Sequence, residues 1–162
     1  MATWQFDFHL LPRSKILERY SRAPAQLSDE EFTAIDWWSG FALPGGYDSV
    51  LESFLPKYTS WNKDASTWGD ENSDLIEIFF ENNVPVEIFV RIDVRKLDIN
   101  LLGKVSHFAK FCHCMLFLGD SEKLIEPDPL SLNYEIERSK AYKYVTDPND
   151  FLDEISNKLK GR

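Results

Sequence analysis

Cysteine, positive charge and long apolar runs are all scarce in this chain of 162 residues. The two cysteines, two positions apart, exclude a disulfide framework and indicate a reducing compartment, which predicts a cytoplasmic protein. The longest hydrophobic runs fall well short of the roughly 20 residues that a transmembrane helix needs. No basic N-terminal stretch precedes an apolar one, so the sequence predicts no secretion signal either.

Basic residues are outnumbered: 18 Lys and Arg stand against 27 Asp and Glu, which gives a formal net charge of −9. An acidic protein repels a phosphate backbone, so this balance disfavours nucleic-acid binding. It favours association with a basic protein, which the electrostatic field attracts. The simpler alternative is that the charge only keeps the protein soluble. The acidic excess is greatest in residues 61–98.

Aromatic residues, in contrast, are abundant, with 5 Trp, 6 Tyr and 12 Phe. Each aromatic side chain can bury on the order of 150–250 Å², so the chain can form a sizeable core without disulfides or metals. Its length suits one domain, and no repeat, low-complexity tract or long linker divides it. The sequence predicts a single domain over residues 1–162.

Alternating apolar and polar residues predict β-strands in several places. Residues 3–11 alternate, and so do the segments DLIEIFFENN and VPVEIFVRIDVR, which together predict a hairpin. Because paired residues share a face, even positions must oppose even positions. A three-residue loop over Asn82–Val84 satisfies this rule by pairing Phe80 with Val86. CMLFLG and LIEP predict a second hairpin around a turn at DSEK.

Capping signals predict helices between and after these strands. Ser28 and Glu31 match a capping box, Asn100 is a candidate N-cap, and Asp147 precedes Pro148 at the expected start of the last helix. The helix after Asn100 repeats apolar residues at the spacing of one helix face: Leu101, Val105, Phe108 and Cys112. Hairpin-linked strands without βαβ alternation predict an α+β fold, a mostly antiparallel sheet of about five strands with helices packed on one face.

The segment Cys112-His113-Cys114 is the first candidate for chemistry. In a strand the two sulfurs would share one face and approach one metal, but a structural zinc site takes four ligands, as a rule in two separated pairs. No second cysteine pair exists, and His9 and His107 are the only other histidines. We interpret both cysteines as core residues and expect no metal site. A metal-binding protein that uses these three residues is the alternative.

One face of the central hairpin collects carboxylates, aromatic rings and arginines. If the aliphatic even-numbered residues point inward, the odd-numbered residues share the outer face. Aromatic and Arg side chains rimmed by charge suit a protein interface, although an ordinary solvated sheet face is the alternative. The polar segment 57–73 is predicted to be a long surface loop. Its two tryptophans are predicted to be exposed and to contact the partner as well. The predicted partner-binding residues are Glu77, Phe79, Glu81, Glu87, Phe89, Arg91, Asp93, Trp61 and Trp68.

The segments DLIEIFF, VEIFVRIDVR, HFAKFCHCMLF, LIEP and SKAYKYVTDPNDFLDEI follow one another over residues 74–155. In this pattern the chain resembles small stand-alone bacterial proteins that act as immunity partners of polymorphic toxins. The resemblance implies an acidic, cytosolic, single-domain protein that occludes the active site of a toxin. It implies no catalytic residues.

The sequence thus favours a non-enzymatic protein-interaction domain. The hypothesis is an immunity-like inhibitor that binds a basic toxin or another protein through an acidic and aromatic sheet face. We expect no catalytic residue, cofactor, nucleic acid or membrane to be involved. A small enzyme or ligand-binding protein with a pocket lined by Trp37, Trp38 and Tyr47 is the main alternative. A homodimer through the sheet face or an exposed sheet edge is another.

Overall fold

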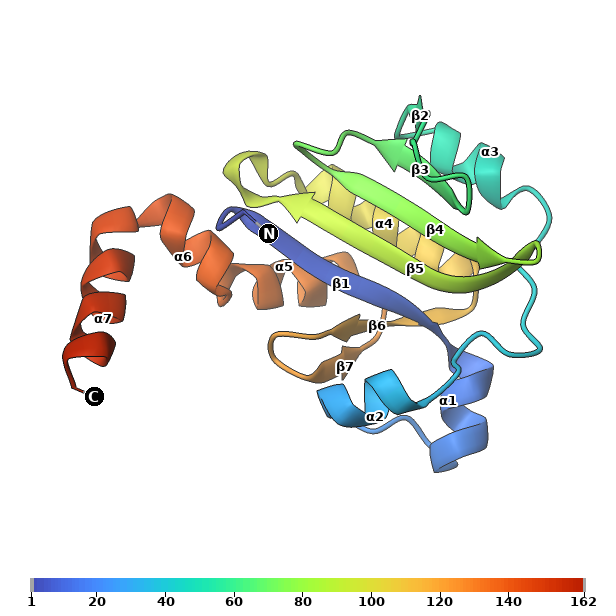
Figure 1. The fold of residues 1–162 in the computed structure, drawn as a ribbon, viewed down its shortest axis with the longest axis horizontal. Helices are drawn as coiled ribbons and strands as arrows, with labels where there is room; N and C mark the ends of the chain where they lie inside the picture. Colours follow the sequence, from blue (N-terminus) through green and yellow to red (C-terminus); the bar gives the residue numbers. More distant parts are fainter. Residues whose placement is uncertain (1, 162) are drawn as a thin grey trace.

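The computed structural model describes residues 2–161 and shows an α+β fold built around one antiparallel sheet (Figure 1). Within these residues the sheet has seven strands: β1 (Gln5–Pro12), β2 (Lys57–Tyr58), β3 (Ala65–Gly69), β4 (Leu75–Glu81), β5 (Val84–Asp93), β6 (Cys114–Leu118) and β7 (Lys123–Ile125). Their order across the sheet is β2-β3-β4-β5-β1-β6-β7, and neighbouring strands are antiparallel.

The predicted fold class is confirmed, whereas the predicted number of about five strands is wrong. The two additional strands, β2 and β3, lie in residues 57–73, where the sequence predicted a surface excursion. β2 is two exposed residues long, and β3 reads ASTWG, so neither shows the hydrophobic alternation that predicts a strand. Pairing with β4, which sets Thr67 opposite Glu77, makes β3 part of the sheet.

Seven α-helices accompany the sheet in the described residues: α1 (Arg13–Tyr20), α2 (Asp29–Ala34), α3 (Tyr47–Glu52), α4 (Ile99–Phe111), α5 (Pro129–Glu137), α6 (Lys140–Thr146) and α7 (Pro148–Lys160). A short 3-10 helix, η1 (Val94–Lys96), follows β5. The predicted caps at Ser28 and Asp147 are confirmed, because each side chain accepts the N–H three residues along. Asn100 is not a cap. The side chain of Asp98 accepts its N–H at 2.9 Å, so α4 begins earlier than predicted.

The hydrophobic core lies between one face of the sheet and the helices behind it. In Figure 1, α4 and α5 lie behind the strands. Leu102, Val105 and Phe108 of α4 are buried. The sheet contributes buried side chains at alternate positions: Phe6, Phe8, Leu10, Ile76, Ile78, Ile88, Val90 and Ile92. Burying each such side chain contributes about 1.5–3 kcal/mol, so this face anchors the fold.

The prediction that helices pack on one face only is wrong at one end of the sheet. α2 lies on the face opposite α4, where the Phe32 ring stacks on Phe117 with centroids 4.5 Å apart. The same ring is 4.9 Å from the ring of His9 on β1. α2 therefore covers the β1–β6 end of this face and leaves β4 and the middle of β5 uncovered (Figure 1).

The β4–β5 turn also differs from the prediction. Asn82 and Asn83 form a two-residue turn, both with positive φ (50° and 63°), as a type I′ turn requires. The expected three-residue loop is therefore wrong. A β-bulge follows, because the register shifts between Phe79 and Phe80, with Val86 as the extra residue. The bulge returns the aliphatic residues of β5 to the inner face.

None of the helices in residues 2–161 has the length and apolar character that crossing a lipid bilayer requires.

Candidate functional site: the open face of the sheet

The face of the sheet opposite α4 is uncovered over β4 and β5, with no helix in front of these strands (Figure 1). We name this surface the open face. It consists of the outward-pointing side chains of β1, β4 and β5: Asp7, His9, Glu77, Phe79, Glu81, Glu87, Phe89 and Arg91. The register brings them together, because Phe89 lies between His9 on β1 and Glu77 on β4. Six of the nine predicted partner-binding residues thus share one surface.

His9 and Glu87 form a polar contact in the centre of the open face. The Nε2 atom of His9 lies 2.7 Å from Oε1 of Glu87, and because a carboxylate only accepts, Nε2 carries the proton. The rings of Phe32 and Phe89 lie 4.9 Å and 5.5 Å from the imidazole and fix its orientation. The Glu87 side chain is 43% exposed. This carboxylate is therefore held in place yet remains accessible.

A second ion pair, between Arg91 and Asp7, is more enclosed. Nε of Arg91 donates to Oδ1 of Asp7 at 3.0 Å, and both side chains are mostly buried. The guanidinium also lies 5.3 Å from the centre of the Phe89 ring. The ion pair with Asp7 therefore fixes the position of Arg91, and its guanidinium lies near an aromatic ring. Arginine side chains held in this way often contribute strongly to protein interfaces.

Glu77 and Glu81 add negative charge along β4. The hydroxyl of Thr67, which is buried, donates to Oε2 of Glu77 at 2.7 Å, so this carboxylate is also fixed. Glu81 lies exposed at the end of the strand next to the turn. These two side chains make this edge of the open face rich in carboxylates.

Asp93, one of the predicted partner-binding residues, is not on the accessible part of this face. It is only 1% exposed and caps η1, accepting from the main-chain N–H and from Nε and Nη2 of Arg95 at 2.8–3.0 Å. Burial works to raise the pKa of Asp93, but the hydrogen bonds from Arg95 outweigh it and hold that pKa below its usual range. Its role is structural, and the predicted contact with a partner is wrong for this residue.

Replacing Asp74 with Asn is expected to stabilise the protein at pH 7 by up to about 1 kcal/mol. Burial raises the pKa of Asp74, so its ionised form is less stable in the folded protein than in the unfolded chain. A raised pKa favours folding at low pH, and this contribution is lost as pH rises through the folded pKa. In the present structure Oδ1 of Asp74 accepts the main-chain N–H of Asp93 at 2.8 Å, and the side-chain oxygen of Asn can accept the same hydrogen bond.

The measurement is urea unfolding of both proteins at pH 7 and near pH 3, where the unfolded carboxyl, with a reference pKa of 3.8, is mostly protonated. The gain should be present at pH 7 and absent at the acidic pH. Asp64→Asn, at an exposed position, is the control and should change stability by less than about 0.5 kcal/mol at both values. A gain that persists at low pH would mean that something other than the charge is responsible.

The tryptophans are distributed differently from the prediction. Trp61 is 87% exposed, as expected, but Trp68 is 1% exposed and belongs to the core. Trp68 lies opposite Ile76, so its ring points to the inner face of the sheet and not to the open face. Trp37 and Trp38 are also buried core residues, and Tyr47 meets Trp68 edge-on, so this geometry does not favour the alternative of a pocket lined by Trp37, Trp38 and Tyr47.

The segment Cys112-His113-Cys114 is the junction between α4 and β6. Cys112 and Cys114 are buried, and burial raises the pKa of Cys112 to about 12, which keeps the thiol protonated. His113 has a φ of 54° and is exposed. Among residues 2–161, no group of three His, Cys, Asp or Glu side chains is arranged to hold a metal ion. The metal-binding alternative is therefore not favoured by this geometry.

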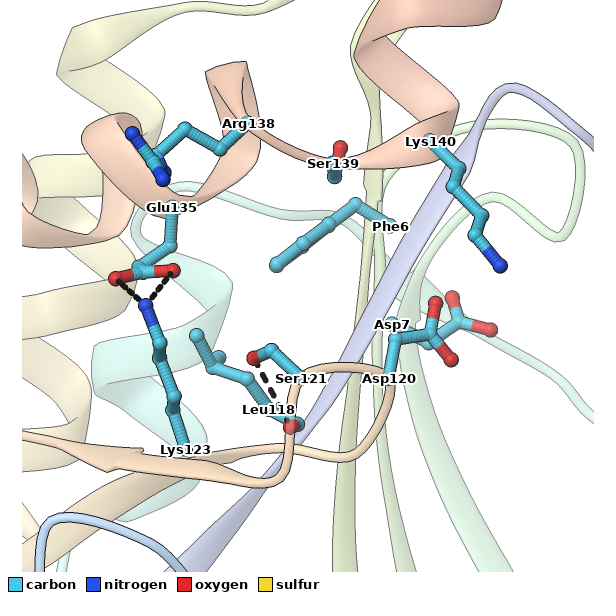
Figure 2. Close-up of a pocket in the computed structure, with 10 residues that line it drawn as sticks. All are labelled: Phe6, Asp7, Leu118, Asp120, Ser121, Lys123, Glu135, Arg138, Ser139 and Lys140. Carbon is cyan, nitrogen blue, oxygen red and sulfur yellow. Dashed lines mark hydrogen bonds and ion pairs between the residues drawn. The ribbon is translucent and has the colours of Figure 1, made fainter. Parts of the chain in front are cut away.

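A pocket of about 320 Å³ adjoins the open face (Figure 2). Its walls come from β1, the β6–β7 turn and the junction of α5 with α6, and Figure 2 shows the ring of Phe6 in its centre. Nζ of Lys123 contacts both oxygens of Glu135, at 3.0 and 3.2 Å, on one side. Asp7 lines this pocket and also belongs to the open face. The sequence did not predict this pocket, because its residues come from distant segments.

The main chain of β1 continues past the end of β6 beside this pocket. Pairing between β1 and β6 ends at His9 and Phe117. At the other end of this pairing, the N–H of Arg13 donates to the carbonyl of His113 at 2.9 Å. Because alternate residues of a strand direct their main-chain groups to the same side, those of Asp7 point toward the pocket beyond the end of β6. The main-chain groups of Asp7 thus border the pocket together with its charged side chains.

Comparisons with known proteins add nothing to this geometry. No protein-family model matches the chain, and neither a curated protein nor a solved structure shows significant similarity to it. The resemblance to toxin-immunity proteins therefore stays a prediction.

Proposed function

We propose that this protein is a non-enzymatic interaction domain that binds a basic protein partner through the open face. The single observation that supports this most strongly is an uncovered sheet face that carries aromatic rings, an arginine and fixed carboxylates together. Protein interfaces favour such a combination of aromatic and Arg anchors with a charged rim. Binding in the manner of an immunity protein, by occluding the active surface of a basic toxin, is the form of this function that we propose.

The anchors of the proposed interface are Phe79, Phe89 and Arg91. All three are partly exposed and project from strands, whose main chain is fixed by the sheet on both sides. Side chains that are already ordered lose less conformational entropy when a partner binds. The open face therefore presents a pre-organised surface and does not need to rearrange.

The carboxylates of the open face would select the charge of the partner. Glu81 and Glu87 are accessible, and the whole chain carries a net charge of −9. Such a field accelerates encounter with a basic surface and suppresses encounter with acidic ones. The pocket beside Asp7 extends the same surface and offers the exposed carboxylate of Asp120 to a Lys or Arg side chain of the partner.

The test is affinity capture from the source cells, followed by calorimetric measurement of the affinity for the captured protein. Changing Glu81 and Glu87 to Lys together is expected to weaken binding by on the order of 10–100-fold. The loss should come mainly from slower association and should shrink at high salt, because screening removes the electrostatic attraction.

The matched control is the double change of Glu52 and Glu137 to Lys. These exposed residues lie on α3 and α5, and the change in net charge is the same. The control should bind nearly as tightly as the unmodified protein. Equal losses in both variants would show that only total charge matters, and unchanged binding in the open-face variant would reject this surface.

A further inference from the structure

The C-terminal helix α7 displays an apolar stripe that the rest of the chain does not cover. Leu152, Ile155 and Leu159 are 55%, 41% and 65% exposed, and no described residue of α7 is buried. A 13-residue helix is about 20 Å long and is marginally stable in water unless its apolar side packs against something. In Figure 1, α7 stands at one end of the molecule, beyond α6.

The contacts with α6 involve a different side of α7. Lys143 on α6 forms ion pairs with Asp150, at 3.7 Å, and with Glu154. The ring of Tyr144 meets that of Phe151 edge-on at 5.5 Å. Because successive helical residues turn by about 100°, the two acidic residues point well away from the apolar stripe. α6 therefore fixes the position of α7 while its stripe remains free.

We propose that α7 pairs in antiparallel orientation with α7 of a second copy of this chain. The spacing of Leu152, Ile155 and Leu159, three and then four residues, is that of the seam between two packed helices. Such a seam is self-complementary under two-fold symmetry. If the two-fold symmetry axis of the dimer passes near Ile155, Leu152 of each chain faces Leu159 of the other chain.

The charges of α7 determine this orientation. Among the charged residues nearer the stripe, Asp153 lies in the first half of α7, and Lys158 and Lys160 lie in the second half. Antiparallel pairing places the acidic half of each helix beside the basic half of the other, and it also opposes the two helix dipoles. Parallel pairing would place like charges together. The acidic half also disfavours an anionic membrane surface as the occupant of the stripe.

The proposed dimer is weak and leaves the open face free. Three apolar layers make an interface smaller than that of stable complexes, so the dissociation constant should be on the order of 10–100 µM. Between β5 and α7 the chain passes through η1, α4, β6, β7, α5 and α6, and α7 lies at one end of the molecule, beyond α6 (Figure 1). Each subunit of the dimer can therefore bind a partner of its own.

Sedimentation equilibrium of the full chain tests the dimer from micromolar to near-millimolar concentration. The chain should pass from monomer to dimer, and Ile155→Asp should weaken dimerisation at least about tenfold, because it places two carboxylates at the axis. Leu130→Asp on α5 is the control, since Leu130 is also exposed, and it should leave dimerisation unchanged. A monomer at every concentration, or equal effects of both variants, would overturn the proposal.

Disulfide cross-linking tests the orientation independently. Under oxidation Ile155→Cys should give a covalent dimer with itself, and Leu152→Cys should cross-link to Leu159→Cys in a mixture. Leu152→Cys should not cross-link to itself, because the two positions lie about 10 Å apart along an antiparallel pair. The natural cysteines are buried and do not compete. Efficient self-cross-linking of Leu152→Cys would indicate parallel helices and would contradict the proposal. Binding of the protein to anionic vesicles without dimerisation would assign the apolar stripe to a membrane and would also contradict it.

Discussion

Replacing Trp68 with Ala is expected to lower the free energy of unfolding by about 3–5 kcal/mol, a large part of the stability of a domain of this size. The ring is 1% exposed, lies opposite Ile76 across the sheet, and meets the ring of Tyr47 edge-on with centroids 6.3 Å apart. Nζ of Lys57 lies 3.8 Å above it. Removing the ring leaves a cavity and deprives all three neighbours of contacts, which urea unfolding measures.

Trp61→Ala is the matched control for Trp68→Ala. Trp61 is 87% exposed in the segment between β2 and β3, so its removal should change stability by less than about 0.5 kcal/mol. Both variants remove a Trp side chain from the same segment, residues 57–73, and the two positions differ in burial. Similar stabilities for both variants would show that Trp68 is an exposed anchor, as its sequence context alone predicts.

Replacing Gly69 with Ala is expected to cost about 3 kcal/mol or more, or to prevent folding. Gly69 ends β3 with a φ of +102°, a conformation that residues with a side chain rarely adopt. A Cβ atom built there would lie 2.1 Å from the carbonyl oxygen of Asp74. That oxygen cannot move away freely, because it accepts the N–H of Asp70 at 2.9 Å and closes the β3–β4 turn.

Gly103→Ala provides the opposite result in the same protein. Gly103 lies inside α4, and a Cβ atom there would meet no atom within 4 Å. Alanine should therefore stabilise the helix by about 0.5–1 kcal/mol. Thermal and urea unfolding of the two variants should shift in opposite directions. A tolerated Gly69→Ala would show that the turn between β3 and β4 has a different main-chain conformation.

The sequence predicted β4 and β5 well because their burial alternates with period two. Ile76, Ile78, Ile88 and Val90 are all buried, as the pattern indicates. β2 and β3 were not predicted, since short polar strands have no such pattern and depend on the register with β4. The same reason explains the error at Trp68: a tryptophan in a polar segment gives no sign of which face its strand will present.

The open face was predicted because alternation that buries even-numbered residues necessarily exposes the odd-numbered ones. Glu87 and Phe89 follow this rule. Asp93 does not, because β5 ends there and the carboxylate turns to cap η1 and bind Arg95. The pocket beside Asp7 has no local signal at all, since three distant segments form its walls.

The amino-acid sequence by itself determined the fold class, the inner and outer faces of the central strands and the caps at Ser28 and Asp147. These features depend on residues close together in the chain, whose spacing sets which side they share. Only the tertiary structure decided the burial of Trp68, the pocket and the uncovered stripe of α7. Each of these depends on which distant segment packs against a surface, and no local pattern encodes that choice.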